Sequence, residues 1–286
     1  MLGKAVVNHF SKNNMYDVYG LSKDNSDVIK TFSGDLTDKA FLNSTLSEIK
    51  PEMIIHCAAN VNLEDCEKNQ DLTFSLHVKA TIQLASFNSA KTKFVYISTD
   101  SVFNGQKGGY IETDMPNPIN YYATTKLEGE KAALTNNPNT IVTRTNMFGI
   151  NSYKKKSLAE WAIQNLSQSK KISGFSDVFF NPLYTMQLAS VIEKLLNSGF
   201  NGIINAGSKD YISKYSFLAM LSDVFGFDNN LIEKAAIDDV VIFNRPKNTT
   251  LKTDLLNKII SFVPDIYDGI KMMKNDFDVA VSRSKA

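Results

Sequence analysis

The chain has 286 residues, of which 43% are hydrophobic and 21% charged, and its net charge is +1. This composition is typical of an ordinary globular protein, and the balanced charge gives no basis for a nucleic acid or an anionic membrane as partner. No apolar run reaches the roughly 20 residues that span a bilayer, and the first ten residues become polar too soon for a signal peptide.

Cysteine and histidine are scarce. The two cysteines, Cys57 and Cys66, do not suggest a disulfide framework, so we expect a cytoplasmic location. The histidines at positions 9, 56 and 77 lack the spacing of metal ligands, so we expect no catalytic metal.

Helix-like and strand-like segments alternate along the first half of the chain. Their patterns predict helices over 2–12, 37–49, 67–90 and 121–135, and strands over 16–21, 53–57, 93–98 and 140–145. In the second half they predict helices over 154–170, 184–198, 213–225 and 265–278, a strand over 202–206 and a loop-rich segment over 226–252. This alternation predicts an α/β fold with a doubly wound parallel sheet, whose ligands bind at the carboxyl ends of the strands.

Tyr122 and Lys126 are the strongest candidates for catalytic residues. On a helix they share a face, and a nearby ammonium lowers the pKa of a phenol, which is ordinarily about 10. Thr99 follows the predicted strand 93–98, so its hydroxyl would lie at the carboxyl end of the sheet and orient a carbonyl or hydroxyl against the phenol. Tyr-x-x-x-Lys alone is common in helices; the Ser98-Thr99-Asp100 segment after an apolar strand is what favours catalysis.

Six motifs follow one another along nearly the whole chain: Gly34-Asp35-Leu36-Thr37-Asp38, Ile55-His56-Cys57-Ala58-Ala59, Ser98-Thr99-Asp100-Ser101-Val102-Phe103, Tyr122-x-x-x-Lys126-Leu-Glu-Gly-Glu130, Arg144-Thr145 and Arg245-Pro246-Lys247-Asn248-Thr249-Thr250-Leu251. In this order they resemble the dTDP-4-dehydrorhamnose reductase family of the extended short-chain dehydrogenase/reductase superfamily. The resemblance implies a Rossmann-type dinucleotide-binding domain over 1–150, to which 176–206 returns, and a mainly substrate-binding region over 151–286. We expect the substrate in a cleft between the two.

The resemblance also implies where a nicotinamide cofactor binds. Asp35 and Leu36 would hold its adenine end, Ala58 and Ala59 would approach its ribose and pyrophosphate, and Lys126 would bridge the nicotinamide ribose beside Tyr122. Ser22 and Lys23 end the second strand of the family's pattern without an acid, which favours a 2′-phosphate and therefore NADPH, although Asp24 leaves NADH possible.

Substrate residues are less well marked. Asn60, Asp100 and Arg245 are plausible polar contacts, with loop capping or a structural role as the alternative. Ser101 stands where the family usually has tyrosine, and Met147 stands near a tryptophan of some members. Loss of these aromatic residues casts doubt on dTDP-rhamnose chemistry itself, but not on reduction of a related nucleotide sugar.

The start of the chain departs most from the family. Gly3 and the following helix match the end of a strand–Gly-x-x-Gly-x-x-Gly–helix pattern, but the first strand and two glycines do not occur. We therefore expect open strand edges, low stability and poor dinucleotide binding. Three explanations stay open: a start upstream of Met1, a truncated gene, or a different segment or subunit that fills the gap.

The resulting hypothesis is NADPH-dependent reduction of the C4 ketone of a nucleotide-linked 4-keto-6-deoxy sugar, for polysaccharide precursors. The alternatives are an NDP-sugar epimerase or dehydratase of the same superfamily, and a non-catalytic subunit resembling the methionine adenosyltransferase β subunit. A homodimer is left open.

Overall fold

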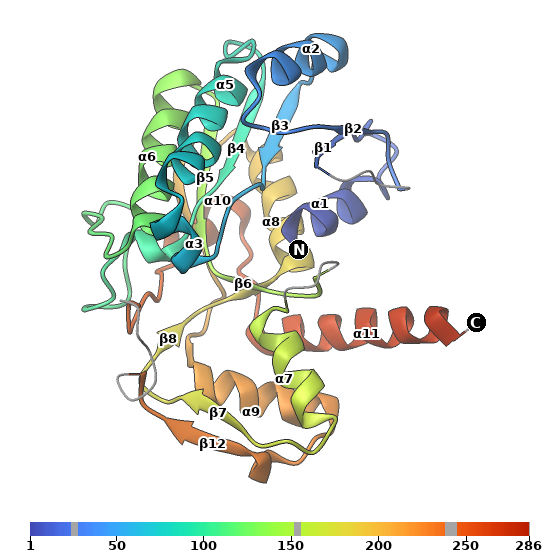
Figure 1. The fold of residues 1–286 in the computed structure, drawn as a ribbon, viewed down its shortest axis with the longest axis vertical. Coiled ribbons are helices and arrows are strands. Elements are labelled where there is room, and N and C mark those ends of the chain that lie inside the picture. Colours follow the sequence, from blue (N-terminus) through green and yellow to red (C-terminus); the bar gives the residue numbers. More distant parts are fainter. Residues whose placement is uncertain (24–27, 152–155, 238–244, 286) are drawn as a thin grey trace.

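The structure, a computed structural model, describes residues 1–23, 28–151, 156–237 and 245–285. Its central element is a parallel sheet with the strand order β10-β5-β4-β3 (Figure 1). The strands are β3 (Met53–His56), β4 (Lys93–Ile97), β5 (Thr140–Thr145) and β10 (Gly202–Ala206). β5 is buried along its whole length, as is β4 after its first residue, because helices cover both faces of the sheet.

Two sets of helices form the outer layers of this doubly wound fold (Figure 1). One face packs on α2 (Lys39–Ile49), α5 (Ala80–Ser86) and α6 (Tyr121–Asn136). The other packs on α1 (Leu2–Phe10), α8 (Thr185–Ser198) and α10 (Asp254–Ile260). The predicted α/β fold of Rossmann type is confirmed.

A second, two-stranded parallel sheet stands apart from the first. β1 (Gly20–Ser22) pairs with β2 (Thr31–Ser33), and within the described ranges neither strand pairs with β3. β3 is therefore an edge strand, and Met53, Ile54 and Ile55 are only half-buried. Open edges at this place agree with what the sequence predicts for the neighbours of the first strand of the family's pattern.

The remaining elements form a smaller lobe and its connections, seen in the lower part of Figure 1. They are β6 (Met147–Phe148), α7 (Leu158–Leu166), β7 (Ile172–Phe175), β8 (Phe179–Phe180), β9 (Leu183–Tyr184), β11 (Ile212–Ser213), α9 (Lys214–Phe225), η3 (Asn229–Leu231), β12 (Ile232–Ala235) and α11 (Ile266–Lys285). Their core includes Ile163, Phe180, Phe217 and Ile270.

The predicted helix over 67–90 is wrong as a single element. The chain forms α3 (Leu63–Lys68), α4 (Gln70–Phe74), a π-helix η1 (Ser75–Lys79) and then α5. Asn69 leaves helical geometry with φ −117° and ψ 58°, which ends α3. A π-helical turn often marks a functional site, and η1 carries His77, which reaches the region of Tyr122.

Other segments also differ from the prediction. The strand expected over 16–21 is shorter and begins later, as β1. The sequence does not predict the strand β2, because its three residues show no sustained alternation of apolar and polar side chains. The helix α11 continues well beyond residue 278. The predicted helix over 154–170 begins partly outside the described residues and is found over 158–166. The strands predicted over 140–145 and 202–206 are confirmed.

Candidate active site

Tyr122 and Thr99 meet at the carboxyl end of β4. The strand ends at Ile97, Thr99 caps the short 3-10 helix η2 (Asp100–Val102), and Tyr122 lies in the first turn of α6, which Asn120 caps. The Thr99 hydroxyl lies close enough to the Tyr122 phenol to lower the pKa of that phenol, while it accepts a 3.1 Å hydrogen bond from the Ser101 backbone N–H and donates a 3.2 Å hydrogen bond to Asp100. The predicted phenol and hydroxyl are thus brought together at the edge of the sheet where parallel α/β folds bind ligands.

Lys126 lies one turn further along α6, but its ammonium is directed into the sheet. The side chain is 3% exposed. Its Nζ donates a 2.7 Å hydrogen bond to the carbonyl oxygen of Ile97 and lies 4.0 Å from the centre of the Tyr96 ring. Burial lowers the pKa of Lys126 to about 7, an effect that the carboxylate of Glu130 opposes.

The expected effect of Lys126 on the tyrosine is therefore wrong for this structure. Burial raises the pKa of Tyr122 to about 12, and the nearby Thr99 hydroxyl counteracts this only in part. The physical reason is that desolvation of a phenolate outweighs its stabilisation by one hydroxyl. Tyr122 consequently holds its proton at neutral pH.

A buried ion pair fixes α6 against the sheet beneath this site. Glu130 and Arg144 are each 2% exposed, and Arg144 donates to both carboxylate oxygens at 2.7–3.2 Å. Ser98 donates a 2.5 Å hydrogen bond to the same carboxylate. Because Ser98 precedes Thr99 and Glu130 lies one turn beyond Lys126, this network sets the position of Thr99 relative to Tyr122.

His77 connects the segment after β3 with α6. Its Nε2 accepts a hydrogen bond from the backbone N–H of Asn60 at 2.9 Å, so its Nδ1 carries the proton and donates to the Thr125 hydroxyl at 2.8 Å. Its ring packs edge-on against Tyr122. Asn60 itself, a predicted substrate contact, uses its side chain to bind Asp65 and the backbone of Asn62, so the capping alternative describes its present contacts.

Asp100 is buried rather than presented to a ligand. It is 2% exposed, and its Oδ2 accepts hydrogen bonds from Asn146 at 2.8 Å and from Thr249 at 2.5 Å. Ser101 donates to the other carboxylate oxygen, and Met147 packs on the core of the sheet. The predicted substrate contacts at these three positions thus make structural contacts here.

The Arg-Pro segment docks on the loop after η2. Asn248 donates from its backbone to the carbonyl of Gly105, which has φ +75°, and a Cβ on Gly105 would lie 2.4 Å from Pro246. Arg245, the last predicted substrate contact, is exposed at the start of this segment. The motif therefore joins the end of the chain to the edge of the site.

The residues implied for the cofactor lie on both sides of the break between the sheets. Lys23 and Asp35 form a 3.1 Å ion pair after β1 and β2, with Ser22 and Leu36 beside them in the chain. Ala58 and Ala59 follow β3. Gly3 lies in the first turn of α1, where an added Cβ would meet nothing nearer than Cys57 at 3.9 Å. Small side chains at the start of a helix suit the close approach of a dinucleotide phosphate, so these residues fit NADPH.

The sequence interpretation did not single out three residues with contacts near the site. Asn146 and Thr249 donate hydrogen bonds to Asp100, and Lys214 lies over the Phe180 ring. Thr249 falls within the quoted Arg-Pro motif and Asn146 directly follows Arg144-Thr145, so both had a signal in the sequence. Lys214 had none, because its contact with the Phe180 ring arises where β11, the strand before α9, pairs with β8.

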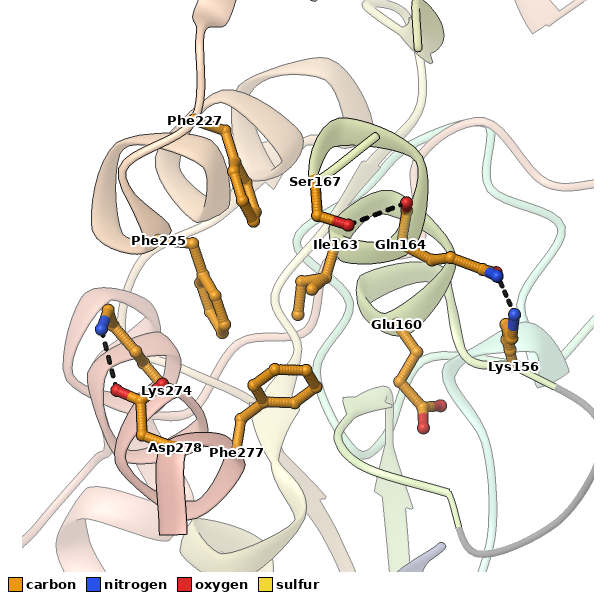
Figure 2. A pocket seen from close by; sticks show the side chains of 10 residues that line it. All are labelled: Lys156, Glu160, Ile163, Gln164, Ser167, Phe225, Phe227, Lys274, Phe277 and Asp278. Carbon is orange, nitrogen blue, oxygen red and sulfur yellow. Dashed lines mark hydrogen bonds and ion pairs between the residues drawn. The ribbon is translucent and has the colours of Figure 1, made fainter. Parts of the chain in front are cut away.

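A separate cavity of about 580 Å³ lies between α7, the end of α9 and α11 (Figure 2). Ile163, Phe225, Phe227 and Phe277 point into it, and Lys274 pairs with Asp278 at its rim. None of the predicted site residues lines it. Across the described ranges there is no group of three or more potential metal ligands, and no helix is long and apolar enough to cross a membrane.

Comparisons with known proteins give one family model and two kinds of relative. The model of the RmlD substrate binding domain matches residues 1–277. Methionine adenosyltransferase 2 subunit beta of Bos taurus is 29% identical over 274 residues, which are 91% of this chain and 79% of that protein. A probable low-salt glycan biosynthesis reductase of Haloferax volcanii, Agl14, is 28% identical over 211 residues, which are 72% of this chain and 70% of that protein.

Solved structures show the same fold. A hypothetical dTDP-4-dehydrorhamnose reductase from Sulfolobus tokodaii is 27% identical with a TM-score of 0.82, and the match covers 94% of this chain and 95% of that one. A dTDP-4-dehydrorhamnose reductase from Bacillus anthracis, solved in complex with NADP, is 22% identical with a TM-score of 0.79 over 90% of this chain and 98% of that one.

Proposed function

Because the chain belongs to the RmlD family, the family of dTDP-4-dehydrorhamnose reductases, we propose that it reduces the C4 ketone of a nucleotide-linked 4-keto-6-deoxy sugar with NADPH. The observation that carries this proposal is the proximity of Tyr122, in the first turn of α6, and Thr99 at the carboxyl end of β4. The glycan biosynthesis reductase among the relatives and the NADP complex among the similar structures support it.

The side chains divide the work as follows. When bound, NADPH supplies the hydride. Tyr122 donates the proton to the oxygen at C4, and its raised pKa suits this direction because the phenol is protonated before the reaction. Thr99 orients that oxygen against the phenol. Ser98, Glu130 and Arg144 hold Thr99 and α6 in place.

The cofactor would lie across the ends of β1, β2 and β3. Lys23 would bind the 2′-phosphate, Asp35 and Leu36 the adenine end, and Ala58, Ala59 and Gly3 would leave room for the pyrophosphate. Lys126 would hold the nicotinamide ribose. We propose that the cofactor binds within residues 1–150 and the substrate mainly within residues 151–286, as the sequence predicts.

The experiment is NADPH oxidation with a panel of NDP-4-keto-6-deoxy sugars, with products identified by NMR. We expect oxidation in step with formation of the 4-hydroxy sugar. Sugar epimers without net NADPH consumption would indicate an epimerase instead. A dehydratase is disfavoured because Asp100 is hydrogen-bonded within the protein, and because Ser101 follows it in place of the glutamate that a resemblance to the dehydratases of the superfamily would imply.

A second candidate function is a non-catalytic subunit, favoured by the methionine adenosyltransferase 2 subunits beta among the relatives. Co-elution with a methionine adenosyltransferase catalytic subunit, together with no NADPH oxidation on any sugar of the panel, would favour this role over reduction.

A further inference from the structure

His77 is a fully buried histidine to which the proposed mechanism assigns no role. It lies in the π-helical turn η1, and its side chain is 0% exposed. Its backbone is held on both sides. The carbonyl oxygen of His77 accepts a 2.7 Å hydrogen bond from the Thr81 hydroxyl, and an added Cβ on Gly129 of α6 would lie 2.7 Å from that oxygen. The imidazole is therefore carried by a turn that packs tightly on α6.

The two ring nitrogens of His77 join segments from different parts of the candidate site. Nε2 accepts the 2.9 Å hydrogen bond from the backbone N–H of Asn60, in the loop after β3. Nδ1 donates to the Thr125 hydroxyl at 2.8 Å, and that hydroxyl donates in turn to the carbonyl oxygen of Tyr122 at 3.0 Å. His77 thus connects the loop after β3 with the backbone of the proposed proton donor.

The ring of His77 suits this link in shape and in protonation. It packs edge-on against the Tyr122 ring, with centroids 5.9 Å apart and planes at 80°. Burial, assisted by the charge of Lys126, lowers the pKa of His77 to about 3, so at neutral pH the imidazole has one donor and one acceptor nitrogen. Both are used. An apolar side chain here would leave a buried N–H and a buried hydroxyl without this partner, which is costly.

We propose that His77 is a positioning residue, which sets the distance between the loop after β3 and Tyr122 so that hydride donor and proton donor reach the same carbonyl group. The proposal rests on the proposed function for the reaction, and on Ala58 and Ala59 of this loop for the approach of the cofactor. A displacement of about 1 Å between reacting groups can lower a rate about 100-fold. Loss of the link should therefore reduce turnover more than it reduces binding of the sugar.

The first test compares NADPH oxidation by His77→Leu and His77→Gln with the wild type. Leucine removes both hydrogen bonds, whereas glutamine offers an amide oxygen to Asn60 and an amide N–H to Thr125. We expect kcat to fall about 10- to 100-fold for leucine, with the KM for the sugar within about threefold, and to stay within about fivefold for glutamine. Leu195→Ala, at a buried position of α8 on the opposite face of the sheet, should lower the melting temperature but leave kcat within about twofold.

Thr125→Val removes the other end of the link. It should lower kcat by a factor similar to that of His77→Leu, and the double variant should lose little more than the larger single loss, because both changes break the same connection. Thr124→Val is the matched control, since Thr124 is exposed on the same turn and its hydroxyl binds the carbonyl of Asn120. Its kcat should stay within about twofold of the wild type.

Four results would overturn the proposal: an unchanged kcat of His77→Leu, equal losses for leucine and glutamine, fully additive losses at positions 77 and 125, or a loss for Leu195→Ala as large as for His77→Leu. Thr125→Val with its control serves the same purpose if His77→Leu does not fold.

Failure of the proposed function is distinguishable, because the link can be measured without turnover. Hydrogen exchange of the Asn60 amide in the cofactor-free chain should be about 10-fold faster in His77→Leu than in His77→Gln or the wild type, and fluorescence titration should show about 3- to 10-fold weaker NADPH binding. A chain that reduces no sugar but shows both effects retains the link. Equal exchange and equal affinity in all three proteins would overturn it.

Discussion

The Thr249 hydroxyl donates a 2.5 Å hydrogen bond to the Asp100 carboxylate, although the two residues are 149 positions apart. With Asn146 on the same oxygen, this contact joins the loop after β4, the segment after β5 and the Arg-Pro segment. The order of the candidate site therefore depends on a residue near the end of the chain.

Thr249→Val tests this dependence. The variant leaves a buried carboxylate oxygen with one partner fewer, so we expect a loss of about 1–3 kcal/mol in the free energy of unfolding, measured in urea. Thr135→Val, at an exposed position of α6, should change it by less than about 0.5 kcal/mol. Equal effects at the two positions would show that the Asp100 contact contributes nothing.

Glu130→Gln breaks the buried ion pair with Arg144. An uncompensated guanidinium at 2% exposure should cost about 3–5 kcal/mol of unfolding free energy. The matched control is Glu128→Gln, because Glu128 lies on the same helix and pairs with Lys131 at the surface, where such pairs contribute about 0–1 kcal/mol. A loss at position 130 no larger than at position 128 would contradict the account of α6 positioning.

Acid should destabilise the protein through His56. Its ring is buried, its Nε2 has no hydrogen-bond partner, and burial lowers its pKa to about 3 from an ordinary 6.5. The unfolded chain therefore binds the proton first as pH falls from about 6.5 towards 3, and stability falls by up to about 1.4 kcal/mol per pH unit.

His56→Leu should remove this contribution. Urea unfolding at pH 6.5, 5.5 and 4.5 should show a shallower decline for the variant than for the wild type. His77, whose pKa burial also lowers to about 3, should sustain the remaining slope. Parallel pH profiles for the variant and the wild type would refute the contribution of His56.

NADPH should bind weakly. The residues implied for its two ends belong to separate sheets, because β1 and β2 are not paired with β3 in the described structure. We expect a dissociation constant in the micromolar range or above by fluorescence titration, and Lys23→Gln should weaken NADPH binding but not NADH binding. A nanomolar constant for NADPH would contradict this expectation.

The sequence predicts the sheet well because its strands are short apolar runs between helices. Residues 140–145 and 202–206 occur as predicted. It does not predict the break of the helix at Asn69, whose backbone leaves helical geometry, or the π-helical turn that carries His77 towards Asn60 and Thr125.

The sequence predicts which residues form the candidate site, but not how their side chains are oriented. The motifs identify Tyr122, Thr99 and Lys126 as neighbours, yet spacing on a helix cannot reveal that the Lys126 ammonium binds the carbonyl of Ile97. Helical spacing also cannot reveal that the Asp100 carboxylate accepts hydrogen bonds from Asn146 and Thr249, or that Lys214 lies over the Phe180 ring. These contacts arise from the packing of segments that are distant in the sequence.

The most direct test of the central claim compares NADPH oxidation by the wild type and by Tyr122→Phe, with millimolar NADPH and an NDP-4-keto-6-deoxy sugar. Loss of the proton donor should lower kcat about 10²- to 10⁴-fold, while thermal unfolding of the variant stays near that of the wild type. Equal rates for the two proteins would contradict the assignment of Tyr122 as the catalytic acid.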